Sequence, residues 1–448
     1  MSSNKNIILI VVDTLRNDTT LIEGNDSDIF REFLRDCSIQ TDVLSPSPWT
    51  LPSHFSIFTG KYVSEHKVDR IYGETSYEEL LNRIRKSKIR LITEELREMG
   101  YSTHGYSANP FVSPETGFDR GFESFVTIDQ RRLSEYVQSN LDKIKSLGNT
   151  YPDILKSLLV SGKLGSIIRL PFLYSRFMNE QKINDFPRNK GGIQTIDLFK
   201  RTSLRKPFFL FFNFMEMHEP YLLKETLRNP FGGFHDILGI SKISENDLTS
   251  MKSIYNDQAV TVKNLLAELF DHLKNINCYD DSLIIVTSDH GQAFKENGYY
   301  GHGLFLYDPI IWVPLLIKYP KNETFEQTNF ISLIDLYVLI KKFVTGEMPR
   351  YYSNERTVFS ESYGTFIEQR DLIEHPRAIS SVSKINSSRK AAYRGGFKLT
   401  VNGTTGEVEE FSFNGKHLDP SEDINTYYSL LEEIYIFKGR EKFKVPIK

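Results

Sequence analysis

Cysteine is scarce in this chain: Cys37 and Cys278 are the only two among 448 residues. Two cysteines cannot build a disulfide framework, and a reducing, cytoplasmic setting is the simplest expectation. A run of about 18 apolar residues is also missing, so we predict no transmembrane helix. The apolar run Ile7–Val12 is too short for the core of a signal peptide and is followed at once by Asp13. We therefore interpret this run as a buried strand.

An excess of charge of one sign is lacking as well. The chain has 55 basic and 58 acidic residues, which gives a formal net charge of −3. It therefore offers no global basic field for nucleic acid. Internal repeats and low-complexity tracts are also absent from the sequence. The composition that remains, 40% hydrophobic and 25% charged, is that of a globular protein large enough to bury a substantial core.

Short apolar runs predict the strands. Continuous runs over residues 6–12, 206–215 and 281–287 are typical of central strands in a parallel sheet. Residues 309–319 predict a further strand, and its internal Pro314 favours an edge or bulged position. Helical patterns cover three longer stretches, residues 77–99, 247–275 and 330–343. These patterns predict an α/β fold with a doubly wound, mostly parallel sheet.

The C-terminal part of the chain has a different pattern. Residues 393–413 contain short strands and Gly-Thr turns, which indicate a small antiparallel sheet. Residues 419–434 predict a final helix. We therefore expect a large domain over residues 1–350 and a small C-terminal antiparallel α/β subdomain over residues 351–448.

Residues 130–200 differ from the rest of the large domain. They are helical in pattern, basic in patches and interrupted by Gly162, Gly165 and Pro171. We interpret them as an insertion packed on the main core, because these residues break any long amphipathic face. The alternative is a membrane-surface helix or a lid over a lipid-like substrate. Under that alternative the protein would contact a membrane peripherally.

The stretch Pro48–Gly60 places a hydroxyl at the predicted first turn of a helix. Thr50 is an N-cap candidate, and Pro52 falls just inside the helix start, where a missing N–H costs nothing. Free N–H groups and a partial positive charge at a helix N-terminus favour anions such as phosphate or sulfate and stabilise an alkoxide. From this stretch alone, Thr50 is either a simple cap or a reactive hydroxyl beside an anion site.

Three predicted buried strands end in residues that can bind metals. Asp13 ends the first, His218 follows the second, and the pair Asp289-His290 follows the third. Doubly wound sheets bring such strand ends to one edge. Two carboxylates, an imidazole and the Thr50 oxygen would suit one Mg²⁺, Mn²⁺, Ca²⁺ or Zn²⁺ ion.

The same residues fit a nucleophilic reaction. A metal on Thr50 would lower the pKa of its hydroxyl and make a nucleophile at neutral pH. His218, together with His302 in a glycine-flanked loop, would bind the remaining substrate oxygens or protonate a leaving group.

Several motifs, taken in order, resemble the sulfatase family of the alkaline phosphatase superfamily. They are IILIVVDTLRND, SPWTLPSHFSIFTG, LREMGYSTHGYSANP with GFDRGF, NFMEMHEPY, LIIVTSDHG, GHGLFLYDPIIWVPLLIKYP and LDPSEDIN. The resemblance covers about residues 5–126, 205–320 and 390–430, and does not include residues 130–200. It implies an alkaline-phosphatase-like α/β domain with a smaller C-terminal piece.

The resemblance also implies roles for individual residues. It implies a nucleophile in the motif that ends in Thr-Gly, a metal on Asp13, Asp289 and His290, and anion-binding groups at His218 and His302. It adds Asn109 as a substrate-contact candidate, because Asn109 falls near a position where sulfatases place a basic residue.

Three departures from the family pattern change the expected chemistry. Sulfatases carry Cys or Ser where this chain has Thr50, and Arg where it has His54, which becomes a substrate-contact candidate. Threonine is not converted to formylglycine. A phosphorylated threonine is therefore a more familiar covalent intermediate than a sulfated one. The paired aspartates of sulfatases are Asp13-Thr14 here, which removes one ligand, and we expect a single divalent ion.

We therefore predict a metal-dependent hydrolase of phosphate or sulfate esters that acts through Thr50. Its substrate would be a small-molecule, glycan or lipid ester. A transferase of a phospho-headgroup onto a glycan or lipid acceptor is the alternative, since residues 130–200 would supply an acceptor groove. A catalytically inactive binding protein is a third hypothesis.

Overall fold

The computed structural model describes nine stretches of the chain and leaves the others undescribed. The described residues are 5–22, 27–71, 76–128, 189–221, 243–321, 331–347, 355–365, 382–437 and 444. Most of the predicted insertion, residues 130–188, lies outside the described residues. The interpretations of this segment as a packed insertion, a lid or a membrane-surface helix therefore stay predictions. Within the described stretches, no helix has the length and apolar character needed to cross a membrane.

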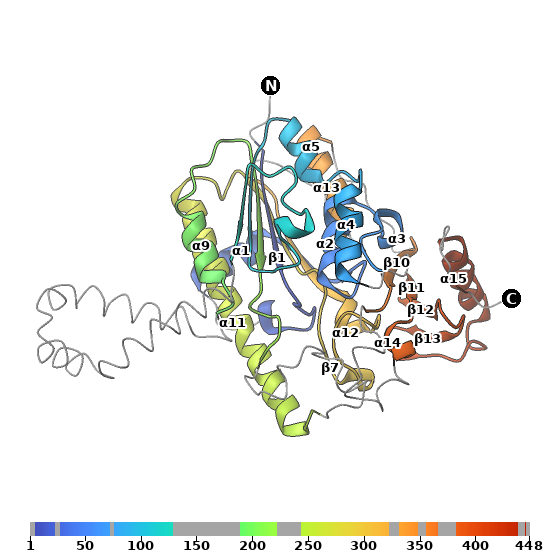
Figure 1. Ribbon diagram of the computed structural model, residues 1–448. Helices are drawn as coiled ribbons and strands as arrows, with labels where there is room; N and C mark the ends of the chain where they lie inside the picture. The colour runs from blue at the N-terminus through green and yellow to red at the C-terminus, as the bar shows by residue number, and fades with distance from the viewer. Residues whose placement is uncertain are drawn as a thin grey trace, which may run out of the picture.

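A seven-stranded sheet forms the centre of the molecule (Figure 1). Its strand order is β2-β9-β6-β1-β5-β3-β4, and β9 is antiparallel to both of its neighbours, while the other pairings are parallel. The prediction of a mostly parallel sheet is therefore confirmed. The strands are β1 (Asn6–Val12), β2 (Ser38–Leu44), β3 (Ser102–Ser107), β4 (Ser124–Thr127), β5 (Phe208–Phe214), β6 (Ser282–Thr287) and β9 (Trp312–Lys318).

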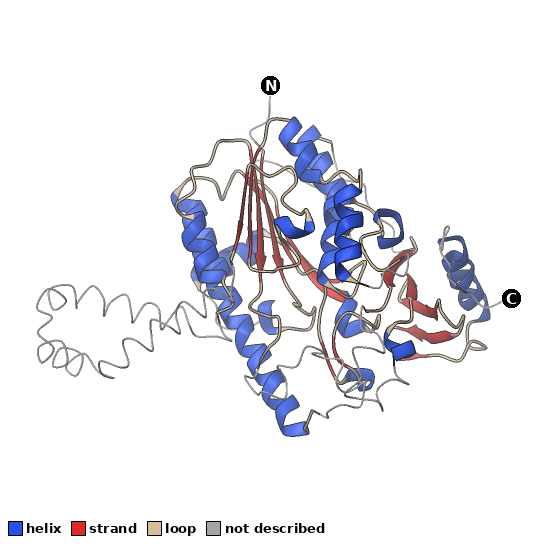
Figure 2. Cartoon of the chain, in the orientation of Figure 1, coloured by secondary structure: helices blue, strands red, loops and turns tan. Residues whose placement is uncertain are grey.

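Helices cover both faces of this sheet, as Figure 2 shows. One face packs on α1 (Asp28–Asp36), α9 (Gly192–Phe199) and α11 (Glu245–Asn275). The other face packs on α2 (Thr50–Thr59), α4 (Tyr77–Lys86), α5 (Ile92–Glu98) and α13 (Asp335–Thr345). Alternate residues of β1 point into the two layers, Ile8 into the first and Leu9 into the second, and both are fully buried. Burial on both sides explains why this strand is a continuous apolar run.

Short elements complete the large domain. They are η1 (Thr20–Ile22), α3 (Val63–His66), η2 (Pro114–Thr116), β7 (Ala293–Phe294), η5 (Glu296–Gly298), β8 (Tyr300–Gly301) and α12 (Asp308–Ile311).

One prediction about a single element was wrong, and another was right in only one of its two alternatives. The helix predicted over residues 77–99 is broken at Ser87, whose backbone is extended and whose hydroxyl accepts the N–H of Ile89 at 3.2 Å, a local alternative to helical bonding. The strand containing Pro314 is not at an edge, because it lies between β2 and β6. The irregular pairing expected there does occur, in the partner strand β2 between Gln40 and Val43.

The C-terminal part forms a second, antiparallel sheet, as predicted. Its strands are β10 (Val358–Ser362), β11 (Arg389–Arg394), β12 (Phe397–Asn402), β13 (Val408–Phe413) and β14 (Lys416–His417), accompanied by α14 (Val382–Ile385) and α15 (Ile424–Phe437). α15 covers the outer face through Leu430 and Ile434, which pack on Leu399. The inner face packs on the large domain through Tyr393. The boundary at residue 350 stays a prediction.

A buried histidine at the end of α3 makes stability depend on pH. His66 is 1% exposed; its Nδ1 accepts the N–H of Val68 at 3.0 Å, so its Nε2–H donates to Ser56 Oγ at 2.9 Å. Burial lowers the pKa of His66 to about 3. Because the folded-state pKa lies below the unfolded value of about 6.5, the stability is present above pH 6.5 and is lost as the pH falls toward 3.

We expect this histidine to cost about 2 kcal/mol of unfolding free energy between pH 7 and pH 5. In His66→Asn, whose side-chain oxygen can still accept from Val68, that part of the pH dependence should disappear. Urea unfolding of both proteins at the two pH values measures the difference. If the unfolding free energy changed equally between pH 7 and pH 5 in both proteins, His66 would not be the titrating group.

Candidate active site

The strand ends predicted from the sequence do meet at one edge of the sheet. Asp13 follows β1 and Asp289 follows β6, and these two strands are adjacent. Thr14 has a left-handed backbone with φ of 59°, and its N–H reaches Asp289 Oδ1 at 3.3 Å. This turn connects the two carboxylates across the edge and fixes their orientation.

Asp13, Asp289 and His290 form a compact, fully buried cluster. One ligand atom from each lies within 4.8 Å of the others, and this is the metal-competent group found among the described residues. Asp13 Oδ1 and Asp289 Oδ2 have no hydrogen-bond partner. His290 Nδ1–H donates to the carbonyl of Gly291 at 2.9 Å, which leaves Nε2 unprotonated and 3.5 Å from Asp289 Oδ2. Two orphaned oxygens and an unprotonated imidazole nitrogen fit a divalent cation.

The electrostatics of the cluster point the same way. Burial raises the pKa of the Asp13 carboxyl well above its usual range, and the neighbouring Asp289 raises it further. Burial also lowers the pKa of His290. Two facing carboxylates are costly without a positive charge between them, and a bound cation would remove that cost.

Thr50 lies at the start of α2, beside the cluster. The prediction that Thr50 is the N-cap was wrong: Trp49 is the extended cap residue, and its carbonyl accepts the N–H of Ser53. Thr50 is the first helical residue, and its side chain makes no cap bond. Its Oγ1 instead lies 3.3 Å from Asp13 Oδ2 and 3.3 Å from His290 Nε2. The hydroxyl is therefore free of a structural role in the helix.

Two serines that the sequence did not single out, Ser45 before α2 and Ser53 within it, bind the end of the strand. The hydroxyls of Ser53 and Ser45 both donate to the carbonyl of Asp289, Ser53 at 2.7 Å. The carbonyl of Pro48 accepts the N–H of Gly303 at 2.9 Å, which brings the His302 loop to the same place. The position of Thr50 is thus fixed from both sides.

His54 and Asn109, the two predicted substrate contacts, already have protein partners. His54 is fully buried; its Nδ1–H donates to the Thr50 carbonyl at 2.9 Å, and its Nε2 accepts from Asn213 at 3.3 Å. The Asn109 amide donates to Asp13 Oδ2 at 2.6 Å. Both residues therefore support Thr50 and Asp13 in this structure, and His54 has no ring nitrogen left for a substrate.

His218 and His302 complete the site on its open side. The His302 ring stacks on His290 with ring centres 4.6 Å apart and lies 5.0 Å from the His218 ring. His302 Nδ1–H donates to Gln292 Oε1 at 2.8 Å, and His218 Nδ1–H donates to the carbonyl of Glu219 at 2.7 Å. Both Nε2 atoms are left over for a ligand. The His218 side chain is 19% exposed, so solvent reaches the site beside it.

Burial lowers the pKa of His218 below its usual value. Burial lowers the pKa of His302 well below its usual value, and repulsion from His290 and His218 adds to this effect. Both rings are therefore neutral at neutral pH in the free protein. An anionic substrate would raise both pKa values and convert each Nε2 into a donor.

Lys190 is an ionisable neighbour of the site that sequence reasoning missed. It is buried, donates to the carbonyl of Glu216 at 2.9 Å, and is attracted to Asp13, Glu216 and Glu219. Burial lowers its pKa to about 7. It stands at the end of a basic stretch, where a single buried lysine has no distinguishing pattern.

The sheet topology and the carboxylate–imidazole cluster at its edge define an alkaline-phosphatase-like α/β protein, as the sequence motifs suggested. The chain belongs to the sulfatase family, whose model, described as Sulfatase, matches residues 5–340.

Two relatives of this chain are distant in sequence. Arylsulfatase K of Rattus norvegicus is 23% identical over 190 residues, covering 41% of this chain and 33% of its own length. The low-salt glycan biosynthesis sulfotransferase Agl7 of Haloferax volcanii is 21% identical over 330 residues, covering 72% of this chain and 57% of its own. The match thus spans a third to little more than half of these relatives.

Among solved structures, the phosphonate monoester hydrolase of Agrobacterium radiobacter superposes with a TM-score of 0.59 at 14% identity. That match covers 97% of this chain and 94% of the other. At this identity the likeness concerns the fold alone.

Proposed function

We propose that this protein is a metal-dependent hydrolase of phosphate or sulfate esters in which Thr50 is the nucleophile. The observation that carries the proposal is the position of Thr50 Oγ1, 3.3 Å from both Asp13 Oδ2 and His290 Nε2. The hydroxyl adjoins a cluster whose Asp13 Oδ1 and Asp289 Oδ2 lack partners. Buried groups without partners are uncommon in folded proteins unless a ligand satisfies them.

Each residue of the site has a separate task. Asp13, Asp289 and His290 would hold one divalent ion, which supplies a Lewis acid that lowers the pKa of a neighbouring hydroxyl and neutralises a substrate oxygen. Thr50 passes its hydroxyl proton to Asp13 Oδ2, 3.3 Å away, and its Oγ1 attacks the phosphorus or sulfur atom and displaces the ester oxygen. His218 or His302, protonated in the complex with the anion, donates a proton to that leaving oxygen. Water then cleaves the Thr50 ester and regenerates the hydroxyl.

Phosphate esters suit this site better than sulfate esters. Thr50 cannot carry the aldehyde hydrate of formylglycine, so a sulfated threonine would have to be released by direct attack of water. A phospho-threonine has the same requirement but is a familiar enzyme intermediate. The test is turnover of 4-nitrophenyl phosphate, bis(4-nitrophenyl) phosphate, a phenylphosphonate monoester and 4-nitrophenyl sulfate by the purified protein. Absence of turnover of all four would contradict the proposal.

Metal removal should abolish this turnover and lower stability. At a metal concentration about 100 times the dissociation constant, binding adds about 2.7 kcal/mol to the free energy of unfolding. We expect that loss when EDTA strips the protein, and recovery with Mn²⁺, Ca²⁺, Mg²⁺ or Zn²⁺. Metal content by mass spectrometry and urea unfolding measure both. Undetectable metal and no stabilisation by any of the four ions would favour a binding protein instead.

A second candidate is a transferase of a phospho- or sulfo-group. The match to the Haloferax volcanii protein named as a sulfotransferase, over 330 residues, motivates it. A transferase would pass the group from Thr50 to an acceptor hydroxyl in place of water. Product analysis with a glycan or a diacylglycerol acceptor present separates the two. Formation of only free alcohol and inorganic anion would rule out the transferase.

A further inference from the structure

The turn that carries His218, residues 215–221 after β5, is bonded to the chain segment at the start of α9. Glu216 precedes His218 by two residues and is fully buried, and its Oε1 accepts the N–H groups of Lys190 at 3.1 Å and Gly192 at 2.8 Å. In return, Lys190 Nζ donates to the carbonyl of Glu216 at 2.9 Å. Three hydrogen bonds therefore connect this segment to both the side chain and the main chain of Glu216.

Two glycines allow this close approach. Gly191 has a left-handed backbone with φ of 115°, and a Cβ there would lie 2.9 Å from the Cβ of Ala108. A Cβ on Gly192 would lie 2.7 Å from Glu216 Oε1. A side chain at either position would displace its neighbours. The sequence Lys190-Gly191-Gly192 is thus suited to bring main-chain N–H groups onto the Glu216 carboxylate.

The Lys190 side chain lies along the same turn and close to the candidate active site. It is 1% exposed and within electrostatic reach of Asp13 and His218. Its Nζ lies 5.5 Å from the centre of the Tyr221 ring, and the Tyr221 hydroxyl donates to the carbonyl of Met217 at 2.8 Å. Lys190 therefore contacts the turn on both sides of His218 in the sequence.

The place of the His218 ring depends on this turn. The N–H of His218 donates to the carbonyl of Met215 at 3.0 Å, and its Nδ1–H donates to the carbonyl of Glu219 at 2.7 Å. Both bonds join His218 to its own turn, so the ring moves with the turn as a unit. A reacting group that is misplaced by about 1 Å can cost about 10²-fold in rate. Contacts that fix the turn therefore bear on the reaction.

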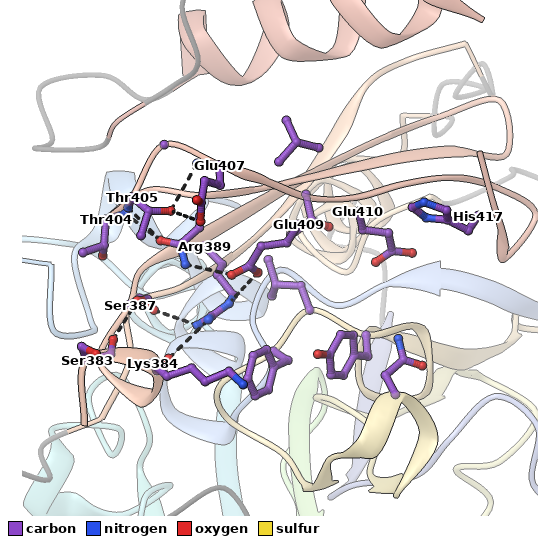
Figure 3. A pocket seen from close by; sticks show the side chains of 18 of the residues that line it. Ser383, Lys384, Ser387, Arg389, Thr404, Thr405, Glu407, Glu409, Glu410 and His417 are labelled. Carbon is purple, nitrogen blue, oxygen red and sulfur yellow. Dashed lines mark hydrogen bonds and ion pairs between the residues drawn. The ribbon is translucent and has the colours of Figure 1, made fainter. Parts of the chain in front are cut away.

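Two other buried basic residues serve other parts of the fold. Arg389 pairs with Glu409 at 2.7 Å, in the cavity of about 1260 Å³ between the C-terminal sheet and the large domain (Figure 3). Lys318 is 1% exposed and donates to the carbonyl of Tyr279 at 2.6 Å. It pairs with Ile284 near the start of β6, whereas the candidate site follows the other end of that strand. Lys318 thus makes the same kind of bond as Lys190, away from the site.

We propose that Lys190 and Glu216 are positioning residues for His218. Their mutual hydrogen bonds hold the turn after β5 in the place where His218 Nε2 meets an oxygen of the ester. This inference rests on the proposed function, in which His218 binds or protonates a substrate oxygen. Both residues act through His218 and not on the substrate.

The kinetic test compares the wild type with Lys190→Met, His218→Asn and the double variant, using the best of the four esters. We expect Lys190→Met to lower kcat/KM by about 10²-fold. The loss should divide between kcat and KM in the same way as the loss in His218→Asn. In the double variant, Lys190→Met should add little, because two residues that act through one group are not additive.

Further variants separate positioning from general stability. Glu216→Gln keeps an oxygen that accepts the N–H groups of Lys190 and Gly192 and should retain most of the activity, whereas Glu216→Leu should resemble Lys190→Met. Lys318→Met is the matched control, which should lower the free energy of unfolding and leave kcat/KM unchanged. Lys190→Gln, with a shorter polar side chain, takes the place of Lys190→Met if the latter does not fold.

Crystal structures of the wild type and Lys190→Met separate this inference from the proposed function, because they show the place of His218 whether or not an ester is cleaved. We expect the His218 ring to be displaced in the variant. A ring that keeps its place, or a kinetic loss that is fully additive with that of His218→Asn, would overturn the positioning role. If the ring is displaced but the wild type cleaves none of the four esters, the positioning of His218 stands and the proposed function fails.

Discussion

Replacing Thr50 by valine should lower turnover of the best ester substrate by about 10³-fold or more. Valine keeps the shape of the buried side chain and removes only the hydroxyl that lies 3.3 Å from Asp13 and His290. The loss should appear in kcat, because the missing group forms the covalent bond. Initial rates over a range of substrate concentrations measure it, and mass spectrometry of the quenched wild-type reaction should detect a phosphate on Thr50.

Two variants make this result specific. Thr50→Ser keeps a hydroxyl and should retain much of the activity. Thr59→Val removes the hydroxyl at the other end of the same helix, where it donates to the carbonyl of Phe55 at 2.6 Å, and should leave turnover unchanged. Full activity of Thr50→Val would exclude Thr50 as the nucleophile, whatever the fate of the proposed metal site.

Replacing Asp289 by asparagine should have opposite effects on the metal-free and the metal-loaded protein. The amide oxygen of the new side chain can still accept the N–H groups of Thr14 and His290, which Asp289 Oδ1 now accepts at 3.3 and 2.9 Å. The metal-free variant loses the repulsion between two buried carboxylates, so its free energy of unfolding should equal or exceed that of the wild type. The loaded wild type should keep its gain of about 2.7 kcal/mol at 100 times the dissociation constant, and the variant should lose it.

Urea unfolding with and without metal, together with metal titration, measures both effects. Asp335→Asn is the matched control: that carboxylate is 3% exposed and pairs with Arg356 at 2.6 Å, away from the cluster. The control should be destabilised and should keep its response to metal. An Asp289→Asn protein that still gains stability from metal would show that the ion is held elsewhere.

Much of the fold follows from local sequence patterns. Strands buried on both faces, such as Asn6–Val12 and Ser282–Thr287, are continuous apolar runs and were predicted at nearly their observed bounds. The interior position of β9 was not predictable from Pro314, because the irregular pairing that accommodates it belongs to β2, a distant strand. The break at Ser87 was missed because the apolar spacing continues through it and only the hydroxyl bond to Ile89 marks it.

The candidate site also contains residues that local sequence patterns predict and residues that they do not. Asp13, Asp289 and His290 were predictable because polar residues directly follow buried strands, and topology alone brings such ends together. The hydrogen-bond partners of His54 and Asn109 were not predictable, because both partners lie on distant elements. His54 contacts Asn213, and Asn109 contacts Asp13. Ser45 and Lys190 stand in no sequence pattern that would mark them as neighbours of the site. Their surroundings are created by tertiary packing, which single-sequence patterns do not encode.

The direction of β9 has a consequence for how this site can change. Because β9 runs antiparallel to β6, the connection over residues 288–311 leaves and re-enters the sheet at the same edge. That one contiguous segment supplies Asp289, His290 and His302. It can be exchanged between homologues, or randomised in a library, while every strand keeps its register. Exchange of this one segment would therefore replace the predicted metal-binding residues and His302 together.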